Sequence, residues 1–391
     1  MHAFIVPGFV LAAAMFAAPV AFAAAEHTAD ARVELGSDSN PYRLNNVLNP
    51  ASGLYTELEM KLARKVPVSQ RQELLFEGKV RYHKLEPDLD DGDRLDVDLK
   101  LGWQDAHRND GRWGLKRSLV LEAGWVDKTY IDRTTGVASQ TAGQPTEDRF
   151  DYSDIKLSGG LDFRSASDTR WLLGAEVRRK NYTDDYGELG LVRLDYDAFE
   201  VEPGVRRRLS EAVLLKLDLP LTWRAYRQRE AKTLNGDAVP GSDLEYFYYG
   251  WDAELEIELS QRWSIEPELR GYVRRDNQDG FADVRKYTVA LQTNFKPDNR
   301  SVLKLAVSYG DRDFTESANR TVDPGEDTDR ARSQLRLGAR YERALSWIPV
   351  TAFVEARYRD VDNDNSSFSY DRSVFTIGLH SGAGLRGGPR R

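Results

Sequence analysis

Side chains with the spacing that catalysis needs are scarce in this chain. Its five histidines are scattered, and no two have the spacing of paired metal ligands. The sequence has no Gly-x-Ser-x-Gly nucleophile motif. It also has no cysteine, which excludes disulfides, cysteine-ligated metals and a thiol nucleophile. We therefore expect no enzymatic activity and no cofactor.

One acidic segment has the spacing of a calcium-binding loop. Asp360, Asp362 and Asp364 fall at positions 1, 3 and 5 of such a loop, and Asp371 falls at position 12. Asn365 replaces the glycine of the turn, and the last position usually carries glutamate. Because acidic loops are ordinarily solvated, we expect no metal here, and these four aspartates are the calcium alternative.

The densest charge falls mostly on alternate residues of short segments. The acidic set comprises Asp252, Glu254, Glu256, Glu258, Glu266 and Glu268. The basic set comprises Arg332, Arg336, Arg340, Arg357 and Arg359. Apolar residues stand between these charges. Because successive side chains of a β-strand point to opposite faces, the pattern predicts strands with one apolar and one charged face.

The same alternation recurs along the whole chain, in segments long enough to cross a bilayer as tilted strands of about ten residues. The 30% of charged residues agrees with this, because only every second strand residue faces lipid. We predict an all-β, antiparallel transmembrane barrel of about sixteen strands. The expected strands cover residues 30–37, 53–64, 72–83, 93–105, 114–127, 152–164, 169–181, 192–208, 212–226, 246–260, 262–274, 285–296, 301–312, 330–342, 348–359 and 372–381.

Connections between these strands alternate between short and long. Those at 165–168 and 209–211 are short, whereas 127–151, 227–245 and 313–329 are long and rich in Gly, Asp, Asn and Thr. Outer-membrane barrels usually have short periplasmic turns and long external loops. We therefore expect both termini in the periplasm.

The charged faces would line the inside of such a barrel. A barrel of about sixteen strands is wide enough for an aqueous channel. The acidic set lies on the expected tenth and eleventh strands and the basic set on the fourteenth and fifteenth. We expect the two sets to face each other across the lumen, where their field would orient polar solutes. The alternative is that arginine–carboxylate pairs only brace the wall.

In architecture, the whole mature chain resembles the sixteen-stranded general porins, although it carries no porin sequence motif. In those porins the loop that corresponds to 127–151 folds inward and narrows the pore. The resemblance implies that Arg133, Glu147, Asp148 and Arg149 are candidates to line a constriction.

A second resemblance lies at the start of the expected barrel. Residues 31–41, Ala-Arg-Val-Glu-Leu-Gly-Ser-Asp-Ser-Asn-Pro, resemble the opening strand of barrels in exopolysaccharide exporters and surface-lipoprotein assembly proteins. Those proteins usually carry a helical repeat domain before the barrel, whereas we expect none in this chain. The resemblance implies polymer export with periplasmic partners as an alternative function.

Residues 1–25 are almost entirely apolar and end in small residues, as in a cleaved signal peptide. We expect the barrel at 26–381 and a flexible, Gly- and Arg-rich periplasmic tail at 382–391. These features place the chain in a Gram-negative outer membrane, in contact with lipid, lipopolysaccharide and the barrel assembly machinery. The net charge of -8 includes no basic cluster of the kind that nucleic acid requires. The strand pattern does not specify an oligomeric state.

These observations predict transport of hydrophilic solutes through a charged lumen. Two alternatives stay open: an export conduit for a secreted polysaccharide, and a non-catalytic surface or assembly scaffold that acts through its loops. Aromatic and acidic residues along the lumen, with a helical periplasmic partner, would favour polymer export. An open pore without either would favour simple diffusion.

Overall fold

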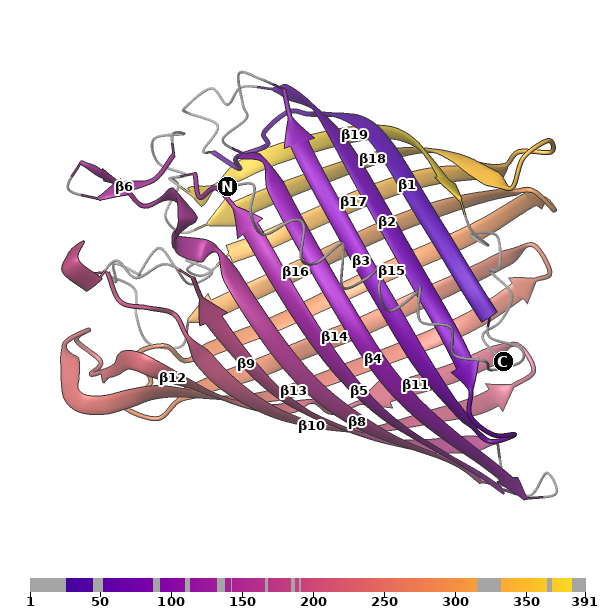
Figure 1. Ribbon diagram of the computed structural model, residues 1–391, viewed down its shortest axis with the longest axis horizontal. Helices are drawn as coiled ribbons and strands as arrows, with labels where there is room; N and C mark the ends of the chain where they lie inside the picture. Colours follow the sequence, from indigo (N-terminus) through magenta and orange to yellow (C-terminus); the bar gives the residue numbers. More distant parts are fainter. Residues whose placement is uncertain are drawn as a thin grey trace.

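Nearly all of the chain that the structure describes belongs to one antiparallel β-sheet that closes on itself (Figure 1). The computed structural model describes residues 26–44, 52–86, 92–109, 113–131, 138–141, 143–165, 168–183, 187–189, 191–314, 332–363 and 368–381. The barrel strands are β1 (Glu26–Asp38), β2 (Gly53–Pro67), β3 (Gln72–Leu85), β4 (Arg94–Asn109), β5 (Trp113–Lys128), β8 (Tyr152–Arg164), β9 (Thr169–Tyr182), β10 (Tyr196–Ser210), β11 (Val213–Asp218), β12 (Leu221–Lys232), β13 (Ala238–Ser260), β14 (Trp263–Asp276), β15 (Val284–Asp298), β16 (Ser301–Phe314), β17 (Arg332–Ala344), β18 (Val350–Asn363) and β19 (Tyr370–Ser381).

Two kinds of element in the described residues lie outside the barrel wall. A small hairpin pairs β6 (Gln140–Thr141) with β7 (Gln144–Pro145). Two short 3-10 helices, η3 (Glu147–Phe150) and η4 (Gly187–Leu189), lie in loops. No helix in the described residues is long and apolar enough to cross a membrane. The expected signal peptide and C-terminal tail fall outside the described residues.

The barrel closes through its first and last strands. β1 pairs with β2 on one side and with β19 on the other, where Arg32 lies opposite His380 and Asp38 opposite Val374. β11 and β12 both pair with β10 and with β13, and the register continues unchanged from the end of β11 to the start of β12, so they are two halves of a single strand. Counted in this way, the described residues form sixteen strands, which confirms the predicted antiparallel barrel.

Pro220 explains why that single strand is divided. Proline has no backbone N–H and so removes one ladder hydrogen bond. Its carbonyl still accepts a hydrogen bond from the N–H of Gly250 at 2.7 Å, and the N–H of Leu219 donates to Pro203 at 3.0 Å. The alternation of faces therefore continues through the break.

Large apolar side chains cover the outer face of the barrel. Leu121 of β5 is 44% exposed, Leu291 of β15 is 43% exposed and Leu305 of β16 is 42% exposed. A soluble monomer rarely exposes an apolar surface of this extent. On a closed barrel with a polar interior, such a surface is the lipid-facing band.

The two faces of β15 give a direct test of this orientation. Leu291 lies at the middle of β15 on the outer face, whereas the next side chain, Gln292, bonds to Glu266 inside the barrel. We expect Leu291→Arg to lower the free energy of unfolding in lipid vesicles by about 2 kcal/mol or more, because it places a cation against hydrocarbon. Gln292→Arg, the matched control, should change it by less than about 0.5 kcal/mol. Equal losses in urea unfolding would contradict the assignment of the faces.

The ends of the barrel differ in the length of their connections. β1 begins and β19 ends at the end that carries the short turns, such as the β10–β11 and β13–β14 connections, and the longer connections lie at the other end (Figure 1). That the short-turn end faces the periplasm stays a prediction.

One predicted loop is wrong: in 227–245, β12 continues to Lys232 and β13 begins at Ala238. The alternation of apolar residues fades there, although the two strands still pair, through two register shifts.

Candidate functional site

The acidic set lies on the inner face of β13 and β14. Lys216 of β11 donates to Glu254 at 2.7 Å and also contacts Glu256. On β14, Glu266 accepts a hydrogen bond from Asn294 at 2.9 Å. Glu268 pairs with Arg270 at 2.5 Å. One part of the predicted acidic wall is therefore neutralised by neighbouring cations.

The arginines of the basic set have different surroundings. Arg340 of β17 is held firmly: its Nε donates to Glu342 at 2.7 Å, one terminal nitrogen donates to Glu355 at 3.0 Å, and its guanidinium lies 3.8 Å from the centre of the Phe353 ring. Arg336 donates to Gln334 at 3.2 Å. Arg340 therefore braces the wall, as the structural alternative predicted, whereas Arg336 lines open space.

The two sets do not face each other, so this expectation is wrong. β14 and β17 are separated only by β15 and β16, whereas opposite walls of a barrel with sixteen strands are eight strands apart. Three acidic and three basic members of the sets instead line one cavity of about 550 Å³: Glu254, Glu266, Glu268, Arg336, Arg357 and Arg359. The error has a simple cause. Every strand pairs with its neighbour in sequence, so strands close in sequence lie on the same side of the barrel.

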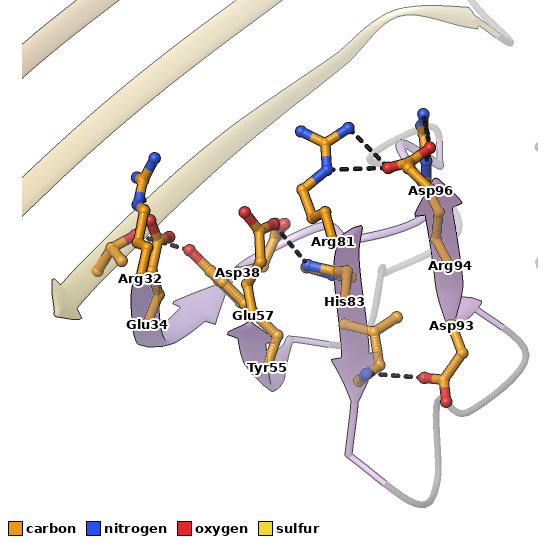
Figure 2. Close-up of polar contacts among 12 residues, drawn as sticks. Arg32, Glu34, Asp38, Tyr55, Glu57, Arg81, His83, Asp93, Arg94 and Asp96 are labelled. Atoms are coloured by element: carbon orange, nitrogen blue, oxygen red, sulfur yellow. Dashed lines mark hydrogen bonds and ion pairs between the residues drawn. The ribbon is translucent and has the colours of Figure 1, made fainter. Parts of the chain in front are cut away.

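A second ion-pair network lines the wall formed by β2, β3 and β4 (Figure 2). His83 contacts Glu57 at 3.3 Å and stacks on Tyr55 at 4.9 Å. Both Arg81 and Arg94 donate to the buried carboxylate of Asp96 at 2.7 Å (Figure 2). Runs of one sign of charge do not reveal this network, because positive and negative side chains are mixed on these strands.

The lumen also carries a row of tyrosines that the sequence analysis did not identify. Consecutive rings of Tyr196, Tyr226, Tyr246, Tyr248 and Tyr272 lie 5.6–6.2 Å apart, on β10, β12, β13 and β14. We call these five residues the tyrosine row. On these strands the even-numbered residues face the lumen, as Glu254 and Arg270 do. The five tyrosines are also even-numbered, so this parity could have identified them from the sequence.

Cations and loops hold the tyrosine row in place. The guanidinium of Arg224 lies 4.5 Å from the Tyr196 ring centre, and that of Arg274 lies 4.3 Å from the Tyr246 ring centre. Arg274 also donates to the carbonyl of Ala282 in the β14–β15 connection at 2.9 Å. Tyr196, Tyr226 and Tyr246 are buried, whereas Tyr248 and Tyr272 are only partly covered. The last two line a cavity of about 270 Å³.

The loop at 127–151 is anchored to its neighbours. Arg149 is buried, donates to the carbonyl of Val192 at 3.3 Å and lies over the Phe150 ring at 5.6 Å. Glu147 accepts a backbone hydrogen bond from Tyr130 through its carbonyl. Asp148 is exposed, and Arg133 lies outside the described residues. In Figure 1 the β6–β7 hairpin of this loop lies beyond the strand ends. A constriction formed by the loop stays a prediction.

The calcium alternative has little support in the structure. Asp360 and Asp362 belong to strand β18 rather than to a loop, and Asp371 lies directly opposite Asp360 on β19. Asp364 lies outside the described residues. The described part of the chain holds no group of three His, Cys, Asp or Glu side chains placed to bind a metal ion. The expectation that the chain is not an enzyme stays a prediction.

No protein-family model matches the chain, and no curated protein does. The solved structures similar to it are outer-membrane β-barrels. A bacterial polysaccharide outer membrane secretin is 9% identical over 90% of this chain and 97% of its own, with a TM-score of 0.46. An anion-selective porin from Comamonas acidovorans is 9% identical over 92% and 99%, with a TM-score of 0.46. The OccK2 (OpdF) structure from Pseudomonas aeruginosa, in complex with glucuronate, is 12% identical over 91% and 98%, with a TM-score of 0.46. We therefore derive the function from the residues that line the lumen.

Proposed function

We propose that this sixteen-stranded barrel is a channel in the outer membrane of a Gram-negative bacterium, and that hydrophilic solutes pass through its lumen. One observation carries the proposal: a closed wall exposes leucines outward and encloses cavities lined by charged side chains. The apolar band fits a membrane, and a barrel of this size fits an aqueous passage. The transport step needs no chemistry from the protein, only a wetted path of sufficient width.

Flux through the lumen can be tested with two matched alanines on paired strands. Ala306 lines the cavity of about 550 Å³, whereas Ala339 is on the outer face, opposite Leu305. We expect vesicles that contain the protein to swell in small neutral sugars. Ala306→Trp should slow swelling several-fold because its ring occupies the lumen, and Ala339→Trp should leave swelling unchanged. Absence of swelling with the unaltered chain would contradict the proposal, as would equal slowing by both variants.

The tyrosine row favours a second candidate, a conduit for a secreted polysaccharide. Aromatic faces and nearby carboxylates suit a chain of sugar rings, which presents both C–H faces and hydroxyl groups. The partly covered Tyr248 and Tyr272 lie in one cavity with Glu200 and Asp252. If polymer passage is the function, oligosaccharides of increasing length should interrupt the ion current for increasing times. Interruption that does not depend on length would contradict this candidate.

A further inference from the structure

Two parallel rows of inward-facing side chains cross the wall of the barrel from β14 towards β18. In each row, the residues lie directly opposite one another on neighbouring strands. The first row comprises Glu268, Ala290, Ser308 and Arg336, on β14 to β17. The second row, two residues further along, comprises Glu266, Gln292, Ala306, Gly338 and Arg357, on β14 to β18. Both rows therefore begin with a carboxylate and end with a guanidinium group, and neutral residues lie between.

Small residues form the floor between the two charged ends. Ala290, Ala306, Ser308 and Gly338 all line the cavity of about 550 Å³. Neither backbone nor packing requires a glycine at 338, because this residue lies within strand β17 and an added Cβ would have its nearest contact 3.8 Å away, at Ala306. The small residues keep the cavity open, and its volume is within the usual range of about 300–1,000 Å³ for ligand pockets. We call this part of the lumen the trough.

The β14 end of the trough carries an excess of negative charge. Glu254 and Glu256 of the neighbouring strand share the single ammonium group of Lys216. Within the described residues, Glu266 is hydrogen-bonded by neutral amides, with that of Asn294 at 2.9 Å. The carboxylate of Glu266 can therefore bind a cationic group of a solute.

The β17 and β18 end carries an excess of positive charge. Within the described residues, Arg336 donates to the neutral amide oxygen of Gln334 at 3.2 Å. Arg357 pairs with Glu355 at 3.4 Å, but Arg340 holds the same carboxylate at the shorter distance of 3.0 Å. Guanidinium groups in this setting suit a carboxylate, which they bind through charge-assisted hydrogen bonds.

The distance between the two ends selects the length of the solute. Three strand spacings of about 4.8 Å and two residues of about 3.4 Å place the backbones of Glu266 and Arg336 about 16 Å apart. A hydrogen bond of about 2.8 Å at each end leaves about 10 Å, and less where side chains converge inside the curved wall. An extended dipeptide spans about 7 Å. A single amino acid is too short, because it carries both charged groups on one Cα atom.

We infer that the trough binds a short zwitterionic peptide, with its ammonium group at Glu266 and Glu268 and its carboxylate at Arg336 and Arg357. This inference rests on the proposed function, because it names the class of solute that the channel would pass. It also gives a role to the separation of charge. A wall that served only to brace the barrel would place opposite charges on adjacent strands, as β2, β3 and β4 do.

Calorimetry on the full chain in detergent tests the site without requiring conduction. The probes are dialanine, N-acetyl-dialanine and dialanine amide, which differ in the charges at their two ends. We expect dialanine to bind at least about tenfold more tightly than either blocked form, because each blocked form loses the charge-assisted hydrogen bonds at one end. Equal binding of the three probes, or no binding of dialanine, would overturn the inference.

Two single variants test which end of the peptide each end of the trough holds. Arg336→Gln should weaken dialanine and N-acetyl-dialanine by about tenfold and leave dialanine amide unchanged, because only the carboxylate is affected. Glu266→Gln should weaken dialanine and dialanine amide to a similar extent and leave N-acetyl-dialanine unchanged. Gly338→Val, which fills the floor and removes no charge, should weaken all three probes. If both charge variants weaken the two blocked probes equally, the assigned orientation is wrong.

Lys100→Gln is the matched control, because it removes a lumen cation from the opposite wall. Lys100 lies on β4, eight strands from β15, and its partner Glu122 keeps Lys156 at 3.0 Å. This variant should bind dialanine as the unaltered chain does, and a loss equal to that of Arg336→Gln would overturn the inference. Vesicle swelling without dialanine binding would overturn the peptide site alone, whereas binding without swelling would overturn only the channel.

Discussion

Replacement of Asp96 by alanine is expected to lower the free energy of unfolding by about 3 kcal/mol. Its carboxylate is the shared acceptor of two guanidinium groups, with Arg81 donating at 2.8 and 2.7 Å and Arg94 donating at 2.9 and 2.7 Å (Figure 2). The variant leaves two neighbouring cations without this acceptor. The loss falls at the lower end of the range for a broken buried ion pair, because both arginines also reach the lumen.

Asp168 provides the control for this prediction. Its pair with Arg164 is 3.0 Å long, but both side chains are 60% exposed. Exposed pairs contribute about 0–1 kcal/mol, so Asp168→Ala should have a small effect. Urea unfolding of both variants in lipid vesicles measures the difference. Similar midpoints for the two variants would contradict a stabilising role for the network on β2, β3 and β4.

Gly378→Val is expected to destabilise the barrel by about 3 kcal/mol, at the upper end of the usual cost of overpacking. Gly378 lies on β19 at the closing seam, opposite Glu34 of β1 and Phe353 of β18. A Cβ atom added there would lie 2.5 Å from the Phe353 ring and 2.6 Å from the backbone oxygen of Val33. The ring can turn aside, but the oxygen belongs to the strand that closes the barrel.

Gly338→Val separates this clash from the general cost of adding a β-branched residue. Gly338 also lies in a strand, β17, and the nearest atom to an added Cβ is the Cβ of Ala306 at 3.8 Å. We expect this control to unfold close to the unaltered chain in the same urea titration. If the two glycine variants lose stability equally, Gly378 has no special role at the seam.

The strands could be predicted from the sequence because their signal is local. Alternation such as Leu95, Val97 and Leu99 against Asp96 and Asp98 specifies both the strand and its two faces. For example, the prediction of 93–105 corresponds to Arg94–Asn109 in the structure. The prediction was wrong in 227–245, because beyond the membrane neither face of a strand needs to be apolar.

The lumen could be predicted only in part. Parity identified Glu254 and Arg336 as inward-facing residues, and both line the same cavity. How far apart these two residues lie around the barrel depends on the order of the strands, not on their charges. The prediction that the acidic and basic sets face each other was made without using this order. The tyrosine row was missed because only charged residues were sought on the inner face, although Tyr248 and Tyr272 share the parity of the charged residues on their strands. That Lys286 of β15, Arg312 of β16 and Arg332 of β17 lie directly opposite one another depends on the register between strands, which a single strand does not reveal.

Single-channel recording of the purified full chain in a planar bilayer tests the central claim, that solutes pass through the charged lumen, most directly. We expect stable, resolved current steps, and we expect Lys286→Gln with Arg312→Gln to shift the ion preference towards cations, because the variant removes two positive charges from the wall. Silence of the correctly folded barrel would contradict the channel and favour a scaffold. Steps whose ion preference does not respond to these charges would show that ions do not pass this wall.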